Sequence, residues 1–272
     1  GIGKSYLAAC YALWCLLQDY DEQILILSGS SQRSVDSSLW VRSLLENPKL
    51  PFLHHLRPSA SQRDSKLSWD VGPATTKHSA SFAALSVGGS IQGRRCTKAI
   101  LDDAEQANNS ASQLQRETLL RSVMDVEAML VPDTDSKIVV LGTFQSLNSI
   151  YQTMVGERGY EAIYIPARVP NDDDEYTGKL AEGVKEMYET GERTGEPTDP
   201  QRFDDEHLTR MEMGMGALQW QIQMMLSTRV SDRLSHPISL DDFIVWDGVN
   251  PYGAPAKIVP SKTKENRLDD LP

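Results

Sequence analysis

Two short motifs, about a hundred residues apart in the chain, contain the residue types that bind and cleave a nucleoside triphosphate. The chain opens on Gly1-Ile2-Gly3-Lys4-Ser5, which matches the second half of the phosphate-binding loop G-x-x-x-x-G-K-[ST]. Glycines let backbone N–H groups approach phosphate oxygens, Lys4 would neutralise the β- and γ-phosphates, and Ser5 would ligate Mg²⁺. We therefore predict that the nucleotide is bound by Gly1, Gly3, Lys4 and Ser5.

The second motif is the acidic stretch Asp102-Asp103-Ala104-Glu105, which follows an apolar run. Asp102 stands where an ATPase places the carboxylate that holds Mg²⁺. A further carboxylate must orient or deprotonate the attacking water, and the sequence leaves this role open between Asp103 and Glu105. Asp103 directly follows the metal ligand, whereas Glu105 has the longer side chain. Alone, such a cluster is typical of a solvated strand end, but together with the loop it predicts a site for ATP and Mg²⁺.

An arginine pair, Arg94-Arg95, lies just before the acidic strand. An arginine can stabilise the charge that develops on a transferred phosphoryl group, from its own subunit or from a neighbouring one. It can also bind DNA phosphates or simply be solvated. Arg95 as an arginine acting on a neighbouring subunit's nucleotide is therefore a hypothesis beside these two alternatives.

The hydrophobic pattern predicts the elements that position these residues. Strands are predicted at 23–27, 66–70, 81–86, 98–101, 137–141, 161–165 and 243–246, and helices at 6–18, 32–46, 111–130 and 207–226. Continuous apolar strands that alternate with helices indicate an α/β fold with a mainly parallel sheet covered on both faces. Ligands of such sheets bind at the carboxyl ends of the strands. The loop, the acidic stretch and Gly142-Thr143 would all lie at that edge.

The composition excludes fewer classes of protein than the two motifs do. The 272 residues contain 40% hydrophobic side chains and no apolar run long enough to cross a bilayer. The net charge is −11, and a single segment, 171–206, carries −9 of it, so the acidity gives no argument for or against a nucleic-acid partner. Three cysteines without metal-binding spacing fit a reducing compartment, and Cys10 and Cys15 are predicted to lie in the core.

Further short motifs are spread along nearly the whole chain. They are Gly88–Arg95, Asn109-Ser110-Ala111, Leu141-Gly142-Thr143-Phe144-Gln145, Pro197–Phe203, Gln223–Leu226, Asn266-Arg267 and Leu271-Pro272. Together with the acidic stretch, they resemble the ATPase region of the large terminase subunit of podovirus-type tailed bacteriophages. In that group the corresponding segments read D-D-x-E, N-S-A, L-G-T-P-Q, P-T-D-P-x-R-F and Q-F-M-L.

This resemblance implies a P-loop NTPase of the ASCE, RecA-like class with a small lid subdomain. Residues 1–166 would form an N-terminally truncated ATPase core, 167–235 the lid, and 236–272 a linker toward an absent nuclease domain. The implied activity is ATP hydrolysis that translocates duplex DNA into the procapsid, without nuclease activity in this chain. The implied partners are duplex DNA, the portal protein and procapsid, the small terminase subunit and further copies in a ring, with no membrane, in the host cell cytoplasm and not in the mature virion.

The resemblance also assigns a role to the segment that follows strand 137–141. Gly142, Thr143 and Gln145 would sense the γ-phosphate and couple hydrolysis to movement. Phe144 replaces the family's proline, so a less rigid loop is expected there. Two alternative functions stay open at this point: a helicase or RecA-like nucleic-acid ATPase, and a nucleotide-gated assembly module without turnover.

Overall fold

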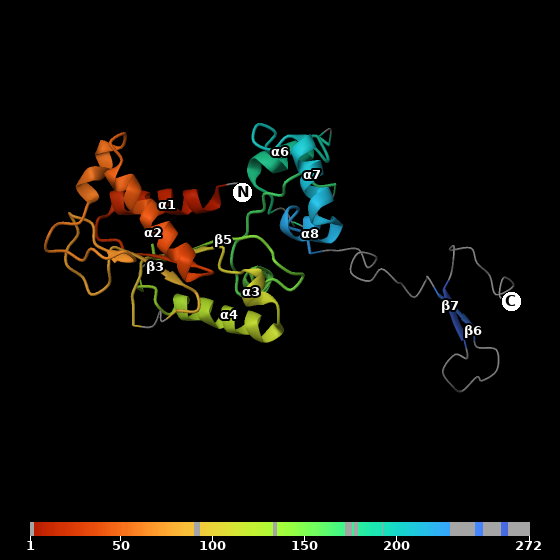
Figure 1. Ribbon diagram of the computed structural model, residues 1–272, viewed down its shortest axis with the longest axis horizontal. Helices are drawn as coiled ribbons and strands as arrows, with labels where there is room; N and C mark the ends of the chain where they lie inside the picture. The colour runs from red at the N-terminus through yellow and green to blue at the C-terminus, as the bar shows by residue number, and fades with distance from the viewer. Residues whose placement is uncertain are drawn as a thin grey trace. The chain divides into compact units, whose positions relative to one another are not determined.

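The computed structural model describes residues 3–89, 93–132, 135–171, 176, 179–191 and 193–228, and the backbone of two short strands closer to the C-terminus (Figure 1). The chain forms two compact units, Gly1–Ala162 and Ile163–Pro272. All sequence-predicted site residues belong to the first unit. The predicted roles of 1–166, 167–235 and 236–272 as core, lid and linker stay predictions.

A five-stranded sheet forms the centre of the first unit, in the order β2-β3-β1-β4-β5. Its strands are β1 (Ile24–Ser28), β2 (Ser68–Trp69), β3 (Phe82–Ser86), β4 (Lys98–Asp102) and β5 (Lys137–Leu141). β1 runs parallel to β3 and β4, β4 runs parallel to β5, and the short edge strand β2 is antiparallel. The register aligns Ser28, Asp102 and Leu141 at the carboxyl ends of three neighbouring strands. The predicted α/β fold with a mainly parallel sheet is confirmed.

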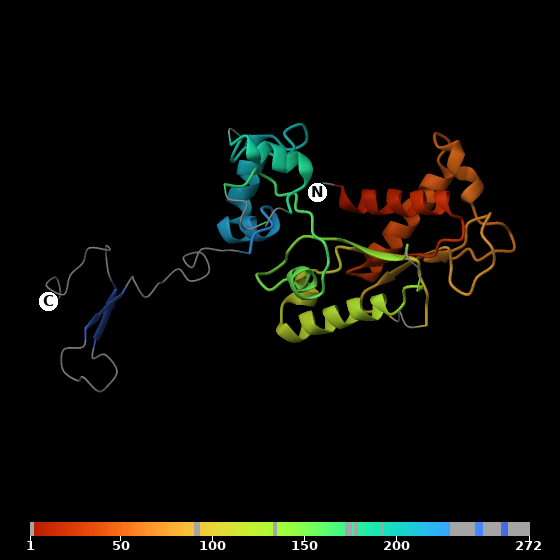
Figure 2. The ribbon, with the colours of Figure 1, turned by 180° about the vertical axis from the view of Figure 1, so that it is seen from behind.

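Helices cover both faces of this sheet, as the two opposite views show (Figures 1 and 2). The helices are α1 (Lys4–Gln18), α2 (Ser31–Glu46), the 3₁₀ helix η1 (Pro51–Leu56), α3 (Ala107–Ser110), α4 (Gln113–Glu127) and α5 (Ile150–Glu157). α1 and α2 lie over one face and α4 over the other. All five side chains of β1 are buried, because alternate residues of a parallel strand face helices on opposite sides. Ile24 and Ile26 pack in one cluster with Leu16 of α1 and Val41 of α2.

Three sequence predictions up to residue 165 need correction. Residues 161–165 do not form a strand: Ile163 and Ile165 are 77% and 45% exposed, and Tyr164 makes a single bridge to Leu180. Apolar side chains alone do not make a strand when no partner strand covers them. The helix predicted at 111–130 spans only Gln113–Glu127, after the separate turn α3. Cys10 is exposed, whereas Cys15 is buried as predicted.

The second unit contains three helices in its described part, α6 (Glu182–Glu189), α7 (Asp205–Met215) and α8 (Ala217–Gln223), and the antiparallel strands β6 (Phe243–Trp246) and β7 (Lys257–Pro260). The single helix predicted at 207–226 is wrong, since Gly216 separates α7 from α8 with φ 79° and ψ 154°. The strand predicted at 243–246 is confirmed as β6. Most of the predicted linker at 236–272 lies outside the described residues.

The P-T-D-P-x-R-F motif forms a turn within this second unit. The Thr198 hydroxyl donates a hydrogen bond to the Pro166 carbonyl at 2.7 Å, and the Phe203 N–H donates to the Asp199 carbonyl at 2.9 Å. These contacts hold the turn that precedes α7. Among the described residues of the whole chain, no helix combines the length and the apolar character that a membrane span requires.

Candidate nucleotide-binding site

The first turn of α1 has the geometry of an anion-binding helix start. Gly3 is its N-cap residue, with φ 84° and ψ 20°, a left-handed conformation that glycine adopts without steric cost. The first turn closes with the bond from the Leu7 N–H to the Gly3 carbonyl, at 3.1 Å. The N–H groups of Lys4, Ser5 and Tyr6 precede this bond and need partners from outside the helix. Such groups, at the positive end of the helix dipole, are suited to phosphate oxygens. Gly1 lies outside the described residues.

The loop and the acidic stretch meet at the carboxyl edge of the sheet. Lys4 Nζ lies 3.8 Å from Asp103 Oδ1, and Ser5 lines the same cavity as Asp102. Asp102 ends β4, and α1 packs on that strand through its buried face. The structure therefore brings Lys4, Ser5, Asp102 and Asp103 together, as the two motifs predicted.

The environment of Asp102 fits a divalent cation. Its side chain is buried, and Oδ1 has no hydrogen-bond partner among the described residues. Burial raises the pKa of this carboxyl, while the nearby Ser5 hydroxyl opposes that shift. A buried carboxylate oxygen without a partner is costly unless a cation binds it. In the described part of the chain, no group of three or more His, Cys, Asp or Glu side chains is placed so that it could hold a metal ion by itself. A Mg²⁺ site needs no such cluster when phosphate oxygens and water supply the other ligands.

Asp103 and Glu105, the two candidates for the water-activating group, have different surroundings. Asp103 has φ 46° and stays partly exposed, where it faces the cations Lys4 and Arg33. Glu105 is 1% exposed, and its Oε2 accepts hydrogen bonds from Ser149 Oγ at 2.5 Å and from the Ile150 N–H at 3.1 Å. Burial raises the pKa of Glu105, although these hydrogen bonds oppose the shift. Of the two carboxylates, only Asp103 pairs with the phosphate-loop lysine.

Arg33 is the basic residue at this site that the sequence analysis missed. It lies in the first turn of α2, which Ser30 caps by accepting a hydrogen bond from the Arg33 N–H, and its guanidinium lies 3.2 Å from Asp103 Oδ2. The signal that could have indicated Arg33 is the position of α2, which directly follows β1. The last residue of β1, Ser28, pairs with Asp102 in the sheet, so the start of α2 lies near the acidic stretch.

A cavity of about 470 Å³ opens between α1 and α2 beside these side chains. It is lined by Ser5, Tyr6, Ala8, Ala9, Ile26, Arg33, Asp36, Ser37, Trp40, Asp102 and Asp103. The candidate metal ligands Ser5 and Asp102 therefore line the same cavity as Asp103 and Arg33.

Arg95 lies at the opposite end of β4, before its first residue. Its N–H donates to Ser79 Oγ and its guanidinium donates to the Ala128 carbonyl, both at 2.9 Å. Because β4 runs for five residues from that end to Asp102, Arg95 is not brought to the carboxylates of its own chain. Its action on a neighbouring subunit stays a prediction.

The segment that follows β5 begins next to Asp102. Leu141 pairs with Asp102 in the sheet, and its carbonyl accepts the Asp103 N–H at 2.9 Å. Gly142 is needed sterically: a Cβ there would lie 2.4 Å from the Tyr151 ring. Phe144, which replaces the expected proline, is buried and stacks on the same ring at a centroid distance of 6.5 Å.

Thr143 and Gln145 continue this segment. The Gln145 side-chain amide donates a hydrogen bond to the Thr143 carbonyl at 3.3 Å. The segment therefore starts at the site edge, but its sensing of the γ-phosphate stays a prediction.

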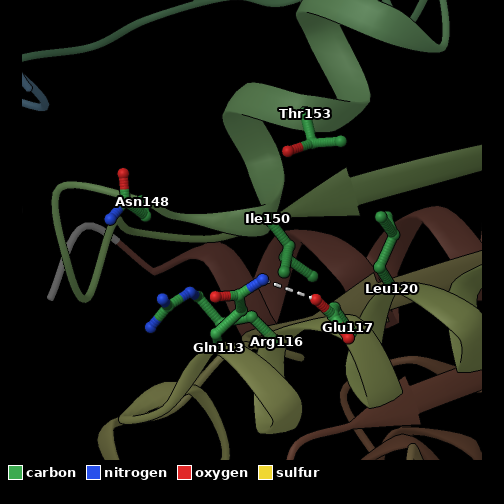
Figure 3. Close-up of a pocket in the computed structure, with 7 residues that line it drawn as sticks. All are labelled: Gln113, Arg116, Glu117, Leu120, Asn148, Ile150 and Thr153. Carbon is green, nitrogen blue, oxygen red and sulfur yellow. Dashed lines mark hydrogen bonds between the residues drawn. The ribbon is translucent and has the colours of Figure 1, made fainter.

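A second hollow, of about 290 Å³, lies between α4 and α5 (Figure 3). Its lining residues are Gln113, Arg116, Glu117, Leu120, Asn148, Ile150 and Thr153. Figure 3 shows the Gln113 amide directed at Glu117, to which it donates a hydrogen bond of 2.8 Å. None of the predicted site residues lines this hollow.

The sheet, its covering helices and the residues at its carboxyl edge thus define an α/β protein with a candidate phosphate and metal site. The whole chain is similar to the large terminase subunit of Enterobacteria phage T3, with 36% identity over 277 aligned positions. The alignment covers all of this chain and 47% of that protein, so the chain spans about half the length of this relative. No protein-family model matches the chain. The similarity confirms the resemblance to large terminase subunits that the motifs indicated.

Proposed function

We propose that this chain is a P-loop ATPase of the ASCE class that hydrolyses ATP to drive duplex DNA into a procapsid. The observation that carries the proposal is the meeting of Lys4 and Ser5 with Asp102 and Asp103 at one edge of a parallel sheet. Similarity to a phage large terminase subunit supports the packaging role. On the same ground we propose the portal protein, the procapsid, the small terminase subunit and further copies in a ring as partners, in the host cell cytoplasm.

Each side chain has a proposed part in hydrolysis. The N–H groups of the first turn of α1 and the Lys4 ammonium bind the phosphates. Ser5 and Asp102 hold Mg²⁺, which supplies positive charge to the phosphate oxygens when bound. Asp103, which is partly exposed and lies 3.8 Å from Lys4, orients and deprotonates the attacking water. Arg33, whose guanidinium lies 3.2 Å from Asp103 Oδ2, holds this carboxylate in position.

The test is steady-state ATP hydrolysis by the intact protein, with and without duplex DNA. Lys4→Ala should weaken nucleotide binding, and Asp103→Asn should leave binding intact while turnover falls by about 10²-fold or more. Lys49→Ala is the matched control, because Lys49 is an exposed lysine outside the site. Stimulation of Lys4-dependent turnover by duplex DNA would support the motor. Nucleotide binding without any turnover would refute the ATPase and favour a nucleotide-gated assembly module.

A further inference from the structure

Glu105 joins the end of β4 to the first turn of α5. Its Oε2 accepts the Ser149 hydroxyl at 2.5 Å and the Ile150 N–H at 3.1 Å. Ser149 is the N-cap residue of α5, and its own Oγ accepts the Tyr151 N–H at 3.3 Å. The carboxylate therefore completes the cap of α5 from a position 45 residues earlier in the chain. A negative group is stabilising at this end of a helix, because the helix dipole is positive there.

Tyr151 makes a second tie between the same two places. Its hydroxyl oxygen accepts the Glu105 N–H at 3.1 Å, so Glu105 contacts α5 through both its backbone and its side chain. The Tyr151 ring packs against Gly142 and Phe144 of the segment that follows β5. Movement at the end of β4 would therefore reach that segment and α5 through one buried cluster.

The start of α5 borders a hollow, so its hydrogen bonds to Glu105 matter for the position of this helix. The 290 Å³ hollow lies between α4 and α5, and Ile150 and Thr153 of the first turns of α5 line it (Figure 3). Ile150 itself is buried, with 3% of its surface exposed. The hydrogen bonds that Ser149 and Ile150 donate to Glu105 are specific contacts at the start of α5.

The turn after Asp102 separates Glu105 from the nucleotide side of the edge. Asn109 holds this turn, since its side chain accepts the Gln106 N–H at 2.7 Å and donates to the Ala104 carbonyl at 2.9 Å. Ala104 is fully buried and Glu105 is nearly so, whereas Asp103 keeps 27% of its side chain exposed beside Lys4. A general base must reach the water that it deprotonates. Glu105 instead directs Oε2 at two protein donors, and its Oε1 is buried without a hydrogen-bond partner among the described residues.

We propose that Glu105 is a positioning residue, which ties the segment from Gly142 to Tyr151 to the end of β4, and that it is not the base that activates water. This role of Glu105 rests on the proposed ATPase function. It adds to that function a path of contacts through which hydrolysis at the nucleotide site would shift α5. α5 is the last helix of the first unit, and the chain continues from it into the second unit at Ile163. A change at the nucleotide edge would thus reach the helix that leads into the second unit.

Two substitutions of Glu105 distinguish a positioning residue from a base that activates water. Glu105→Gln keeps an oxygen that accepts both hydrogen bonds, so kcat should stay within about threefold of the wild-type value. Glu105→Ala removes the acceptor, so kcat should fall by about tenfold or more while KM for ATP is little changed. Asp103→Asn is the comparison, with a loss of about 10²-fold or more. Ser149→Ala should reduce kcat in the same direction as Glu105→Ala, which keeps the test available if the alanine variant folds poorly.

Amide hydrogen exchange on the same intact proteins gives a readout that does not depend on turnover. Glu105→Ala and Ser149→Ala should speed exchange of the Ile150 and Tyr151 amides, whereas Glu105→Gln should not. A Glu105→Gln variant as inactive as Asp103→Asn would overturn the proposal, as would unchanged exchange at these amides in Glu105→Ala. A wild-type protein without ATP turnover would refute the proposed function instead. The exchange pattern would still show whether Glu105 holds the start of α5.

Discussion

Gly142→Ala should destabilise the first unit because the new methyl group has no room. A Cβ at this position would lie 2.4 Å from one ring carbon of Tyr151, with a second ring carbon and the hydroxyl oxygen at 2.5 Å. Real Cβ atoms do not approach other heavy atoms so closely, so the ring or the backbone must shift. The ring is not free to shift, since Tyr151 is 8% exposed and its hydroxyl accepts the buried Glu105 N–H.

The size of the effect follows from two terms. Forcing an extra methyl group into a packed core costs about 1–3 kcal/mol. If the ring moves away from the Glu105 N–H, the loss of that bond adds about 1 kcal/mol or more. The sum, about 2–4 kcal/mol, should lower the urea midpoint by about 1–2 M for a slope of about 2 kcal/mol/M. Circular dichroism during urea unfolding measures this midpoint.

Gly156→Ala provides the matched control within α5. A Cβ at Gly156 meets nothing within 4 Å, and the residue lies inside the helix, where alanine is favoured over glycine by about 0.5–1 kcal/mol. The same substitution should therefore raise the midpoint at Gly156 and lower it at Gly142. Equal midpoints for the two variants would refute the steric reasoning. A Tyr151→Leu change in the Gly142→Ala background should recover part of the loss, and no recovery would show that the ring is not the obstacle.

Three further predictions concern single side chains. Cys10 should be the thiol that iodoacetamide modifies fastest in the native protein, because it is exposed whereas the other two cysteines are buried; mass spectrometry that finds a buried cysteine labelled as fast would contradict this. Arg33→Ala should lower kcat about tenfold, equivalent to about 1.4 kcal/mol, with ATP binding retained, since the guanidinium lies 3.2 Å from Asp103; an unchanged kcat would exclude this role. Burial raises the pKa of Glu105 above its usual 4.5, so the stability of the wild-type protein should fall relative to that of Glu105→Gln as pH rises through the raised pKa. Below about pH 4 the stabilities of the two proteins should converge, because the carboxyl is then protonated in both the folded and the unfolded state. Thermal melts in which the difference in stability does not change with pH would refute this prediction.

The sheet could be predicted from the sequence because its central strands, β1 and β4, are buried on both faces. β1, β4 and β5 appear as continuous apolar runs, and β1 and β4 are buried at every residue. The run at 161–165 has the same appearance but lacks a partner strand, and pairing depends on distant parts of the chain. The break at Gly216 was missed for a different reason, since a glycine within a helical pattern is compatible with either continuation or a stop.

The site was predictable where its residues belong to known motifs. Lys4, Ser5 and Asp102 were found in this way, and the packing of α1 on β4 explains why they meet. Arg33 was not found, because its proximity to Asp103 depends on which strand is next to β4, and 70 residues separate the two in the chain. Arg95 looked equivalent in sequence but precedes β4, and the strand direction places it at the wrong end for its own chain.

The different roles proposed for Asp103 and Glu105 follow from one backbone angle. In an extended continuation of β4, residues 103 and 105 would point to the same face, so their spacing gives no reason to separate them. Asp103 instead has φ 46°, a left-handed conformation that aspartate tolerates better than most residues, and its N–H is fixed to the Leu141 carbonyl. This turn ends the strand at Asp102, leaves the Asp103 carboxylate with Lys4 and Arg33, and directs Glu105 into the core beside α5. One acidic stretch can thereby serve two tasks, with hydrolysis proposed for the carboxylate at the edge and coupling for the buried one.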